Sequence, residues 1–360
     1  MKRKAFIFFV LTTAAGTALA QTSPEQLLLK DYRPKSIYRV PVHHIERAKF
    51  PVIDVHSHPY AQSSAEIGEW VKTMDRAGIE KTIILSMANG ARFDSIYAAY
   101  AAWPNRFEVW CGFDFHGYDQ PGYGPSAVAE LERCYKLGAR GVGELGDKGE
   151  GLVYGNEPAP GMHLEDPRMD PLLEKCAQLG MPVSIHVGDP IWMYQPMDST
   201  NDGLMNGYTW RLDNKKNLVD LTGMVASLER AVARHPRTTF IACHFANCDY
   251  DLTALGKLLD RYPNLYADIS ARYAETAPVP RATRAFYEKY STRLLYGTDM
   301  GMDAEMYAVT FRILESADEH FYEIGLFNYH WPLYGLDLSD KVLKRVYRTN
   351  ALKALYPGKK

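Results

Sequence analysis

The chain has almost no net charge, because 41 lysine and arginine residues are balanced by 43 aspartate and glutamate residues, which leaves a formal charge of −2 over 360 residues. Proteins that bind nucleic acid usually gather positive charge, so the composition gives no case for such a partner. After the first twenty residues, no apolar run is long enough to span a membrane. We therefore expect a small molecule as the partner, and a homo-oligomer remains open.

Cysteine is scarce as well. An odd number at scattered positions does not predict a disulfide framework, although one bridge stays open in an oxidising compartment. Two of the cysteines flank His244, which raises the alternative of zinc ligation. Burial as small apolar side chains is the better interpretation, because the first of the two ends an apolar run. The five cysteines are Cys111, Cys134, Cys176, Cys243 and Cys248.

The first twenty residues have the pattern of a secretory signal peptide. A basic start at Lys2 to Lys4 precedes an apolar run from Ala5 to Ala15, and Ala18-Leu19-Ala20 forms a small-x-small cleavage site. We expect residues 1–20 to be removed and the protein to be exported to the periplasm or the medium. A retained N-terminal anchor is the alternative. Residues 21–50 are interpreted as an N-terminal extension.

Eight β-rich apolar runs alternate with helical patterns over residues 51–356. Most runs are apolar on successive residues, as expected for parallel strands that are buried on both faces. The runs are Val52–Val55, Thr82–Leu85, Glu108–Phe113, Arg140–Glu144, Pro182–Val187, Thr239–Cys243, Leu265–Ile269 and Leu294–Tyr296.

The intervening patterns predict amphipathic helices over Ser126–Leu137, Asp170–Leu179, Val219–Arg234 and Leu252–Tyr262. Strict alternation favours a parallel sheet, and eight repeats favour a single-domain (β/α)8 TIM barrel over 51–356. An open doubly wound sheet is the alternative, but its Gly-rich G-x-G-x-x-G turn is absent after the first run. The stretch Ser339–Tyr356 predicts one further helix that packs on the barrel.

The fifth and sixth strands are separated by an unusually long segment, Gly188 to Asn217. A long loop inside a compact domain is usually a lid or a binding loop, and its aromatic residues argue against disorder. We expect a lid over the site, in which Trp192 and Trp210 form an apolar wall for the substrate.

Polar residues gather where the predicted strands end, which is where barrel enzymes carry their catalytic groups. His56 and His58 follow the first strand and lie two residues apart, so both side chains point to one side. His186 ends the fifth strand, His244 the sixth, and Asp299 follows the eighth. The imidazoles of His56, His58 and His186, together with the carboxylate of Asp299, suit Zn²⁺ better than Fe²⁺ or Mn²⁺. A catalytic zinc keeps a position open for water and lowers the pKa of that water.

These motifs resemble the amidohydrolase superfamily, and within it the amidohydrolase-related branch of metal-dependent TIM-barrel hydrolases and decarboxylases. The resemblance implies that His56 and His58 are the ligand pair of the first strand and that His186 is the ligand of the fifth. It implies that Asp299 binds metal and takes a proton from the attacking water. The matching segments are Val52–His58, Pro182–His186, Cys243–His244 and Tyr296–Asp299, and the resemblance runs from Pro51 to Tyr356.

The number of metal ions depends on two further residues. In one-metal members of the superfamily the residue that His244 matches polarises the substrate or the water, and in two-metal members it binds a second ion. Two-metal members often carry a carboxylated lysine on the fourth strand, where this chain has Glu144. Glu144 either bridges two ions, binds one, or orients a histidine from outside.

Arg272 follows the seventh strand and is a candidate clamp for a substrate carboxylate. A structural salt bridge, for example with Asp268, is the equal alternative. Together the residues favour a hydrolase that directs water activated by one or two divalent metal ions to an amide, ester or lactone carbonyl. Non-oxidative decarboxylation is the alternative, because the same branch includes decarboxylases with a similar metal shell. An exported, non-catalytic binding protein is disfavoured by the complete ligand set.

Export makes a direct prediction about the mature chain. Protein recovered from the periplasm or the medium should begin at Gln21, because the residues before it form the cleaved peptide. Mass spectrometry of the intact protein measures this end. Recovery of a cytoplasmic chain that still carries Met1 would contradict export.

Overall fold

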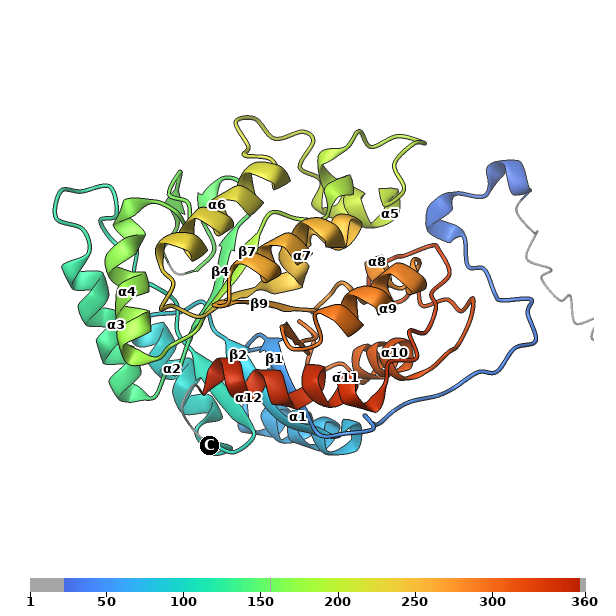
Figure 1. The fold of residues 1–360 in the computed structure, drawn as a ribbon, viewed down its shortest axis with the longest axis horizontal. Helices are drawn as coiled ribbons and strands as arrows, with labels where there is room; N and C mark the ends of the chain where they lie inside the picture. Colours follow the sequence, from blue (N-terminus) through green and yellow to red (C-terminus); the bar gives the residue numbers. More distant parts are fainter. Residues whose placement is uncertain (1–22, 156, 357–360) are drawn as a thin grey trace, which may run out of the picture.

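The structure is a computed structural model that describes residues 23–155 and 157–356, so the predicted signal peptide lies outside the described residues. The described chain folds as a (β/α)8 TIM barrel, with parallel strands inside and helices around them (Figure 1). All eight predicted strands are confirmed. They are β1 (Val52–Ser57), β2 (Ile79–Leu85), β3 (Phe107–Trp110), β4 (Val142–Asp147), β7 (Val183–Val187), β8 (Phe240–Ala242), β9 (Leu265–Asp268) and β10 (Leu294–Leu295).

The strands follow one another around the barrel in chain order. One parallel run joins β1, β2 and β3, and a second joins β4, β7, β8, β9 and β10. Backbone hydrogen bonds connect the two runs at both seams. Gly143 donates to Cys111 at 2.9 Å between β3 and β4, and Val55 donates to Tyr296 at 2.9 Å between β1 and β10.

The outer layer consists of helices that lie between successive strands (Figure 1). They are α1 (Ser64–Ala77), α2 (Gly90–Tyr100), α3 (Pro125–Leu137), α4 (Asp170–Leu179), α6 (Leu221–Arg234), α7 (Leu252–Arg261), α9 (Pro280–Lys289) and α10 (Ala304–Glu315). Two shorter helices, α5 (Leu204–Gly207) and α8 (Tyr273–Thr276), lie in the segments that follow β7 and β9. The four helices predicted from periodicity are α3, α4, α6 and α7, with ends that differ by at most two residues.

Helix α6 illustrates why these segments are helical. Asp220 precedes the helix and accepts a hydrogen bond from the backbone N–H of Gly223, which satisfies one of the unpaired donors of the first turn. Met224, Leu228 and Ala231 are buried and recur at intervals of three and four residues, so they form one apolar face. Helix α6 therefore packs this face against the barrel.

Strand β4 is longer than predicted. The apolar run ends at Glu144, but the strand continues to Asp147, because Leu145 and Asp147 pair with Ile185 and Val187 of β7. Asp147 also pairs with Leu152 of a small antiparallel hairpin, β5 (Gly151–Leu152) and β6 (Ala159–Pro160). Pairing with neighbouring strands thus keeps the end of β4 in a strand conformation, although the apolar pattern of the sequence does not extend that far.

The barrel interior is closed at one end by the C-terminal helix. The predicted helix Ser339–Tyr356 is formed by α11 (Asp340–Lys344), a π-helical turn (Arg345–Thr349) and α12 (Asn350–Leu355). Leu355 and Ala351 pack in one cluster with strand residues such as Ile53 and Trp110. Tyr356 donates to Glu108, the second residue of β3, at 2.8 Å, so α12 covers the N-terminal ends of the strands.

The segment after β7 is ordered and packs on another part of the chain. Trp192 lies in a short 3-10 helix, is 8% exposed, and donates from Nε1 to Asn206 Oδ1 at 3.1 Å. Its ring meets the ring of Trp331 at 5.8 Å between centroids. The N-terminal extension runs outside the barrel (blue in Figure 1) and is attached where the backbone N–H of His43 donates to Asp318 at 2.8 Å.

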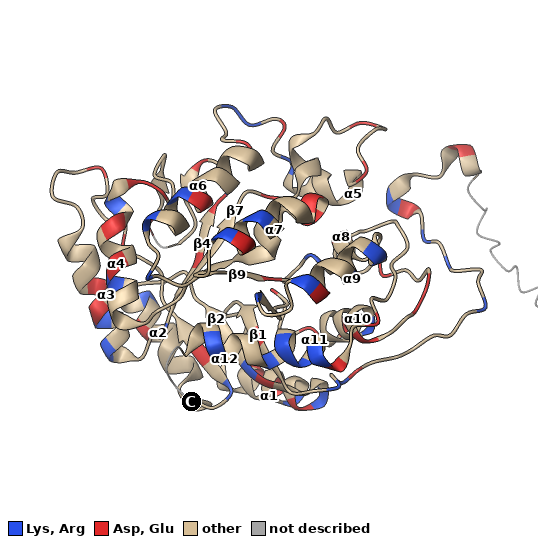
Figure 2. Cartoon of the chain, in the orientation of Figure 1, with Lys and Arg blue, Asp and Glu red and all other residues tan. Residues whose placement is uncertain are grey.

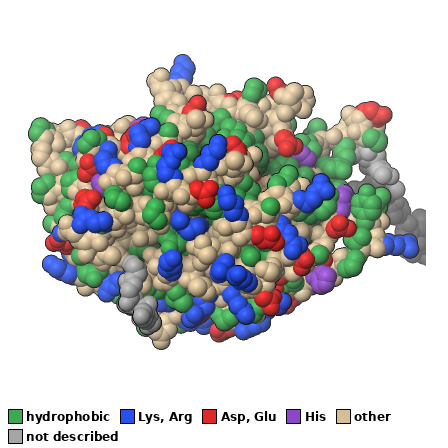
Figure 3. Space-filling model, viewed as in Figure 1, with side chains coloured by type: hydrophobic (Ala, Val, Ile, Leu, Met, Phe, Trp, Pro, Cys, Tyr) green, Lys and Arg blue, Asp and Glu red, His purple; other side chains and the backbone are tan. Residues whose placement is uncertain are grey.

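Charged residues of both signs are dispersed along the outer helices (Figure 2), and their side chains are spread over the face shown in Figure 3. This dispersion agrees with the formal net charge of −2. Within the described part of the chain, no helix combines the length and the apolar character that a membrane span requires. All five cysteines lie in this part, and each is buried with a free thiol.

The position of α12 predicts a large loss of stability when its apolar contact is shortened. Leu355→Ala leaves a cavity between the helix and the barrel interior, so the free energy of unfolding should fall by about 2–4 kcal/mol. Denaturant unfolding followed by circular dichroism measures the change. Lys353→Ala, at an exposed position of the same helix, is the control and should change little. Equal effects of the two variants would contradict the packing described here.

Candidate metal centre

One group of donors joins the first and last strands of the barrel. His58 Nε2 lies 3.1 Å and His56 Nε2 lies 3.7 Å from Asp299 Oδ1. The backbone N–H of Asp299 donates to the carbonyl of His56 at 2.8 Å, which fixes the two segments relative to each other. One donor atom from each of these residues lies within 4.8 Å of the other two, so the three can hold one metal ion.

A second group lies beside the first. His186 is the penultimate residue of β7, and its Nδ1 lies 3.0 Å from Glu144 Oε1. His244 follows β8, and its Nε2 lies 3.2 Å from the same oxygen. His244 and Asp299 both have a left-handed backbone, with φ of 57° and 64°, and each therefore turns its segment sharply where the strand ends.

Glu144 lies between the two groups. Its Oε1 is 3.6 Å from His56 Nε2, and its Oε2 is 3.5 Å from His58 Nε2. Both oxygens thus face the first group while Oε1 also contacts His186 and His244. Of the three roles open for Glu144, this position fits a bridge between two donor groups.

Outer partners orient three of the four imidazoles. Nδ1 of His56 donates to Asp268 Oδ2 at 2.9 Å, Nδ1 of His58 to the Leu85 carbonyl at 2.9 Å, and Nδ1 of His244 to the Ser270 carbonyl at 2.9 Å. With the proton on Nδ1, each ring presents the lone pair of Nε2 to the centre. Such partners are what metal-binding histidines usually have.

Asp268 connects the two donor groups. While Oδ2 contacts His56, Oδ1 accepts from the backbone N–H of His244 at 2.9 Å and from the hydroxyl of Ser270 at 2.5 Å. From the sequence alone, Asp268 is only an alternative partner of Arg272. Its position at the end of β9, like the positions of the other polar residues at strand ends, could have indicated that it belongs to the site.

The donors fit a divalent cation. His56 Nε2 is buried and has no hydrogen-bond partner, although buried polar atoms are normally paired. Burial opposes ionisation of Glu144, yet His56 and His186 hold the pKa of Glu144 well below its usual value. Burial also opposes ionisation of Asp299, but His58 and His56 lower its pKa. Two ionised carboxylates among imidazole nitrogens are a donor set that divalent metals prefer.

The pKa values of His56 and His244 shift in opposite directions because their surroundings differ. Burial opposes protonation of His56, but Asp268 and Glu144 raise its pKa well above the usual value. Burial lowers the pKa of His244, which stays neutral. A cation would compete with protons for these nitrogens, because metal binding requires unprotonated imidazole.

Two residues that sequence analysis missed lie beside His186. Its Nε2 is 3.2 Å from Asp189 Oδ1, and the same oxygen is 3.0 Å from Lys148 Nζ. Both residues stand directly beyond strand ends, Lys148 after β4 and Asp189 after β7. The second contact of His186 is therefore with a carboxylate that already has a cationic partner.

Arg272 is buried and held by its own neighbourhood. Nε and Nη2 donate to Asn247 Oδ1 at 2.9 and 2.6 Å, and Nη1 lies 3.7 Å from Glu275 Oε1. Burial raises the pKa of Glu275 to about 8. The carboxylates nearest Arg272 are Glu275 and Asp249, whereas Asp268 faces His56.

The two predicted aromatic wall residues differ in their positions. Trp192 is buried against Trp331, with its Nε1 bonded to Asn206. Trp210 is 43% exposed, and its ring meets that of Phe327 at 6.4 Å between centroids. Phe327, which was not singled out from the sequence, thus brings the segment after α10 into contact with the segment after β7.

Comparison with known proteins supports the architecture. A family model described as amidohydrolase matches residues 53–356. A putative amidohydrolase from Staphylococcus aureus has a TM-score of 0.53 at 15% identity, over 85% of this chain and 99% of that one. An uncharacterised TIM-barrel protein from Bordetella bronchiseptica has a TM-score of 0.52 at 16% identity, over 85% of this chain and 98% of that one. A 2,6-dihydroxybenzoate decarboxylase from Rhizobium has a TM-score of 0.50 at 17% identity, over 85% of this chain and 98% of that one. Among curated proteins no significant match is found.

The contacts of Asp268 predict that it controls metal affinity without binding metal. Asp268→Asn removes the negative charge behind His56, so metal affinity should fall about tenfold to a hundredfold. Competition with a chromophoric chelator measures the affinity. Asp260→Asn, on the surface of α7 beside Lys289, is the matched control and should leave it unchanged. Wild-type affinity in the Asp268 variant would show that the contact is only structural.

Proposed function

Since the chain belongs to the amidohydrolase family, an enzyme family that depends on metal ions, we propose that it hydrolyses an amide, ester or lactone bond of a small molecule. The observation that carries the proposal is the carboxylate of Glu144, which faces two separate groups of metal donors. Hydrolysis needs both an activated water and a polarised carbonyl, and two adjacent cation positions serve both needs. Decarboxylation needs no attacking water.

The residues divide between two cation positions in this proposal. His56, His58 and Asp299 hold one ion, His186 and His244 hold a second, and Glu144 lies between them. The nitrogen-rich donor set favours Zn²⁺. A divalent cation bound here supplies Lewis acidity, which lowers the pKa of water and polarises a carbonyl group.

The protein's own groups move the proton. Asp299 is ionised, and its side chain is 26% exposed, so it can reach both the centre and a bound substrate. We propose that it accepts a proton from the attacking water and returns it to the leaving group. His244 donates from Nδ1 to Ser270, so its Nε2 is left as a lone-pair donor, which suits a ligand of the second ion.

Location follows from the N-terminal pattern alone. We propose export to the periplasm or the medium on the basis of the small-x-small site that ends at Ala20.

Two substitutions separate proton transfer from metal binding. Asp299→Asn keeps the size and one oxygen ligand but removes the base, so it should retain most of its metal and lose at least about a hundredfold in kcat. His186→Ala removes a ligand and should lose metal and activity together. Metal content per chain and turnover are measured on the same preparations, with Asp260→Asn as control.

The substrate panel contains esters, lactones, amides and carboxylic acids. Near-normal turnover of a metal-loaded Asp299→Asn would contradict the proton-transfer role. Release of CO₂ from the acids without hydrolysis of the other compounds would establish the decarboxylase alternative. A chain that binds metal but turns over no member of the panel would favour a binding protein. One ion per chain at saturation would contradict the bridging role of Glu144.

A further inference from the structure

A hollow of about 360 Å³ adjoins the metal centre at Asp299. Most of its wall is apolar or aromatic, and Asp299 stands at one side of it. Its lining consists of Tyr60, Asp299, Met300, Met302, Asp303 and Phe327. Its volume falls within the range of about 300–1,000 Å³ that small-molecule sites occupy.

The second carboxylate of the lining is already bonded. Asp303 precedes α10 and accepts hydrogen bonds from the backbone N–H groups of Glu305 and Met306, at 2.8 and 3.3 Å. Its carboxylate thus caps a helix. Asp299 is therefore the carboxylate through which a ligand in the hollow meets the metal centre.

The aromatic walls are held in place by neighbouring segments. The hydroxyl of Tyr60 donates to the carbonyl of Asp299 at 2.5 Å, and its ring meets that of His58 at 5.8 Å between centroids. The ring of Phe327 meets Tyr273 at 6.3 Å, and its carbonyl accepts from Asn206 at 3.2 Å. Both aromatic rings of the hollow thus also contact residues outside its lining, Tyr60 through His58 and Phe327 through Tyr273.

We propose that this hollow binds the leaving-group half of the substrate. This half leaves as an apolar alcohol or amine, such as an aryl-methyl alcohol. The inference rests on the proposed hydrolysis, because Asp299 is the group that returns a proton to the leaving group. An apolar wall gives a polar leaving group no partner, so it selects for burial of hydrocarbon surface. The two methionines can adapt to aryl groups of different shape.

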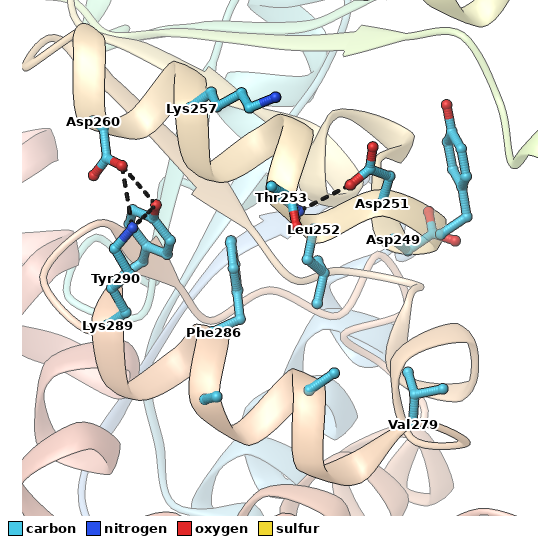
Figure 4. Close-up of a pocket in the computed structure, with 13 residues that line it drawn as sticks. Asp249, Asp251, Leu252, Thr253, Lys257, Asp260, Val279, Phe286, Lys289 and Tyr290 are labelled. Atoms are coloured by element: carbon cyan, nitrogen blue, oxygen red, sulfur yellow. Dashed lines mark hydrogen bonds and ion pairs between the residues drawn. The ribbon is translucent and has the colours of Figure 1, made fainter.

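A second hollow provides the comparison. It has about 540 Å³ and lies between α7 and α9, where Leu252 and Phe286 point into the space between the helices (Figure 4). Its rim carries Asp260 and Lys289, which pair at 3.2 Å. None of the six metal-centre residues lines it, so it serves as the control surface for apolar binding.

The test uses benzyl alcohol and ethanol as probes of the full mature chain. The protein carries ¹³C-methyl methionine, and Met300→Leu and Met302→Leu identify the two methyl resonances. Benzyl alcohol should shift both resonances in a saturable way, through the ring current of its aryl group, and ethanol at the same concentrations should not. Phe327→Ala should weaken benzyl alcohol binding about three- to tenfold, which is the contribution of one aromatic contact.

Val279→Ala, in the hollow between α7 and α9, is the control and should leave the affinity unchanged. Phe327→Leu retains an apolar side chain if Phe327→Ala unfolds, and it should give a smaller loss in the same direction. Absence of a saturable shift, equal shifts with ethanol, or wild-type affinity in both Phe327 variants would overturn the proposal. The binding needs no turnover, so a chain that binds benzyl alcohol here but hydrolyses nothing would refute the proposed function and leave the apolar site in place.

Discussion

The burial of ionised carboxylates among histidines is the constraint on which the rest of the site depends. Glu144 is buried and the side chain of Asp299 is only 26% exposed, and an unpaired charge with so little access to water is unfavourable. Positive charge must therefore face them, as protons on the imidazoles or as metal ions. The arrangement of His56, His58 and His186 around these carboxylates meets that requirement.

The barrel meets the constraint by means of backbone turns at the strand ends. His244 and Asp299 adopt left-handed backbone conformations, which cost L-residues on the order of 1 kcal/mol each. Hydrogen bonds offset this cost, because Asp268 accepts from the N–H of His244 and the carbonyl of His56 accepts from the N–H of Asp299. The site is thus built from connections between strands that are far apart in the chain.

The sequence predicted the barrel because its strands are buried on both faces, and burial leaves an unbroken apolar run. Six polar residues were also expected at one end of the barrel, because they lie at the ends of parallel strands that run in the same direction. The connections between them were not predictable, because a pair such as His56 and Asp268 has no common periodicity. Aromatic content is ambiguous in the same way: Trp192 packs in the interior, while Phe327, in a segment with no pattern, lines the hollow.

The cover that α12 forms over the N-terminal ends of the strands affects the order in which the protein can fold. Leu355, among the last residues of the fold, packs in one cluster with Ile53 of the first strand. The inner faces of the strands therefore lack this apolar cover until α12 has been made. Contacts between residues so distant in the chain form late, because the intervening loop must be closed first. Until α12 closes this end, the strands can consequently be held only by their neighbours in the sheet and by the outer helices.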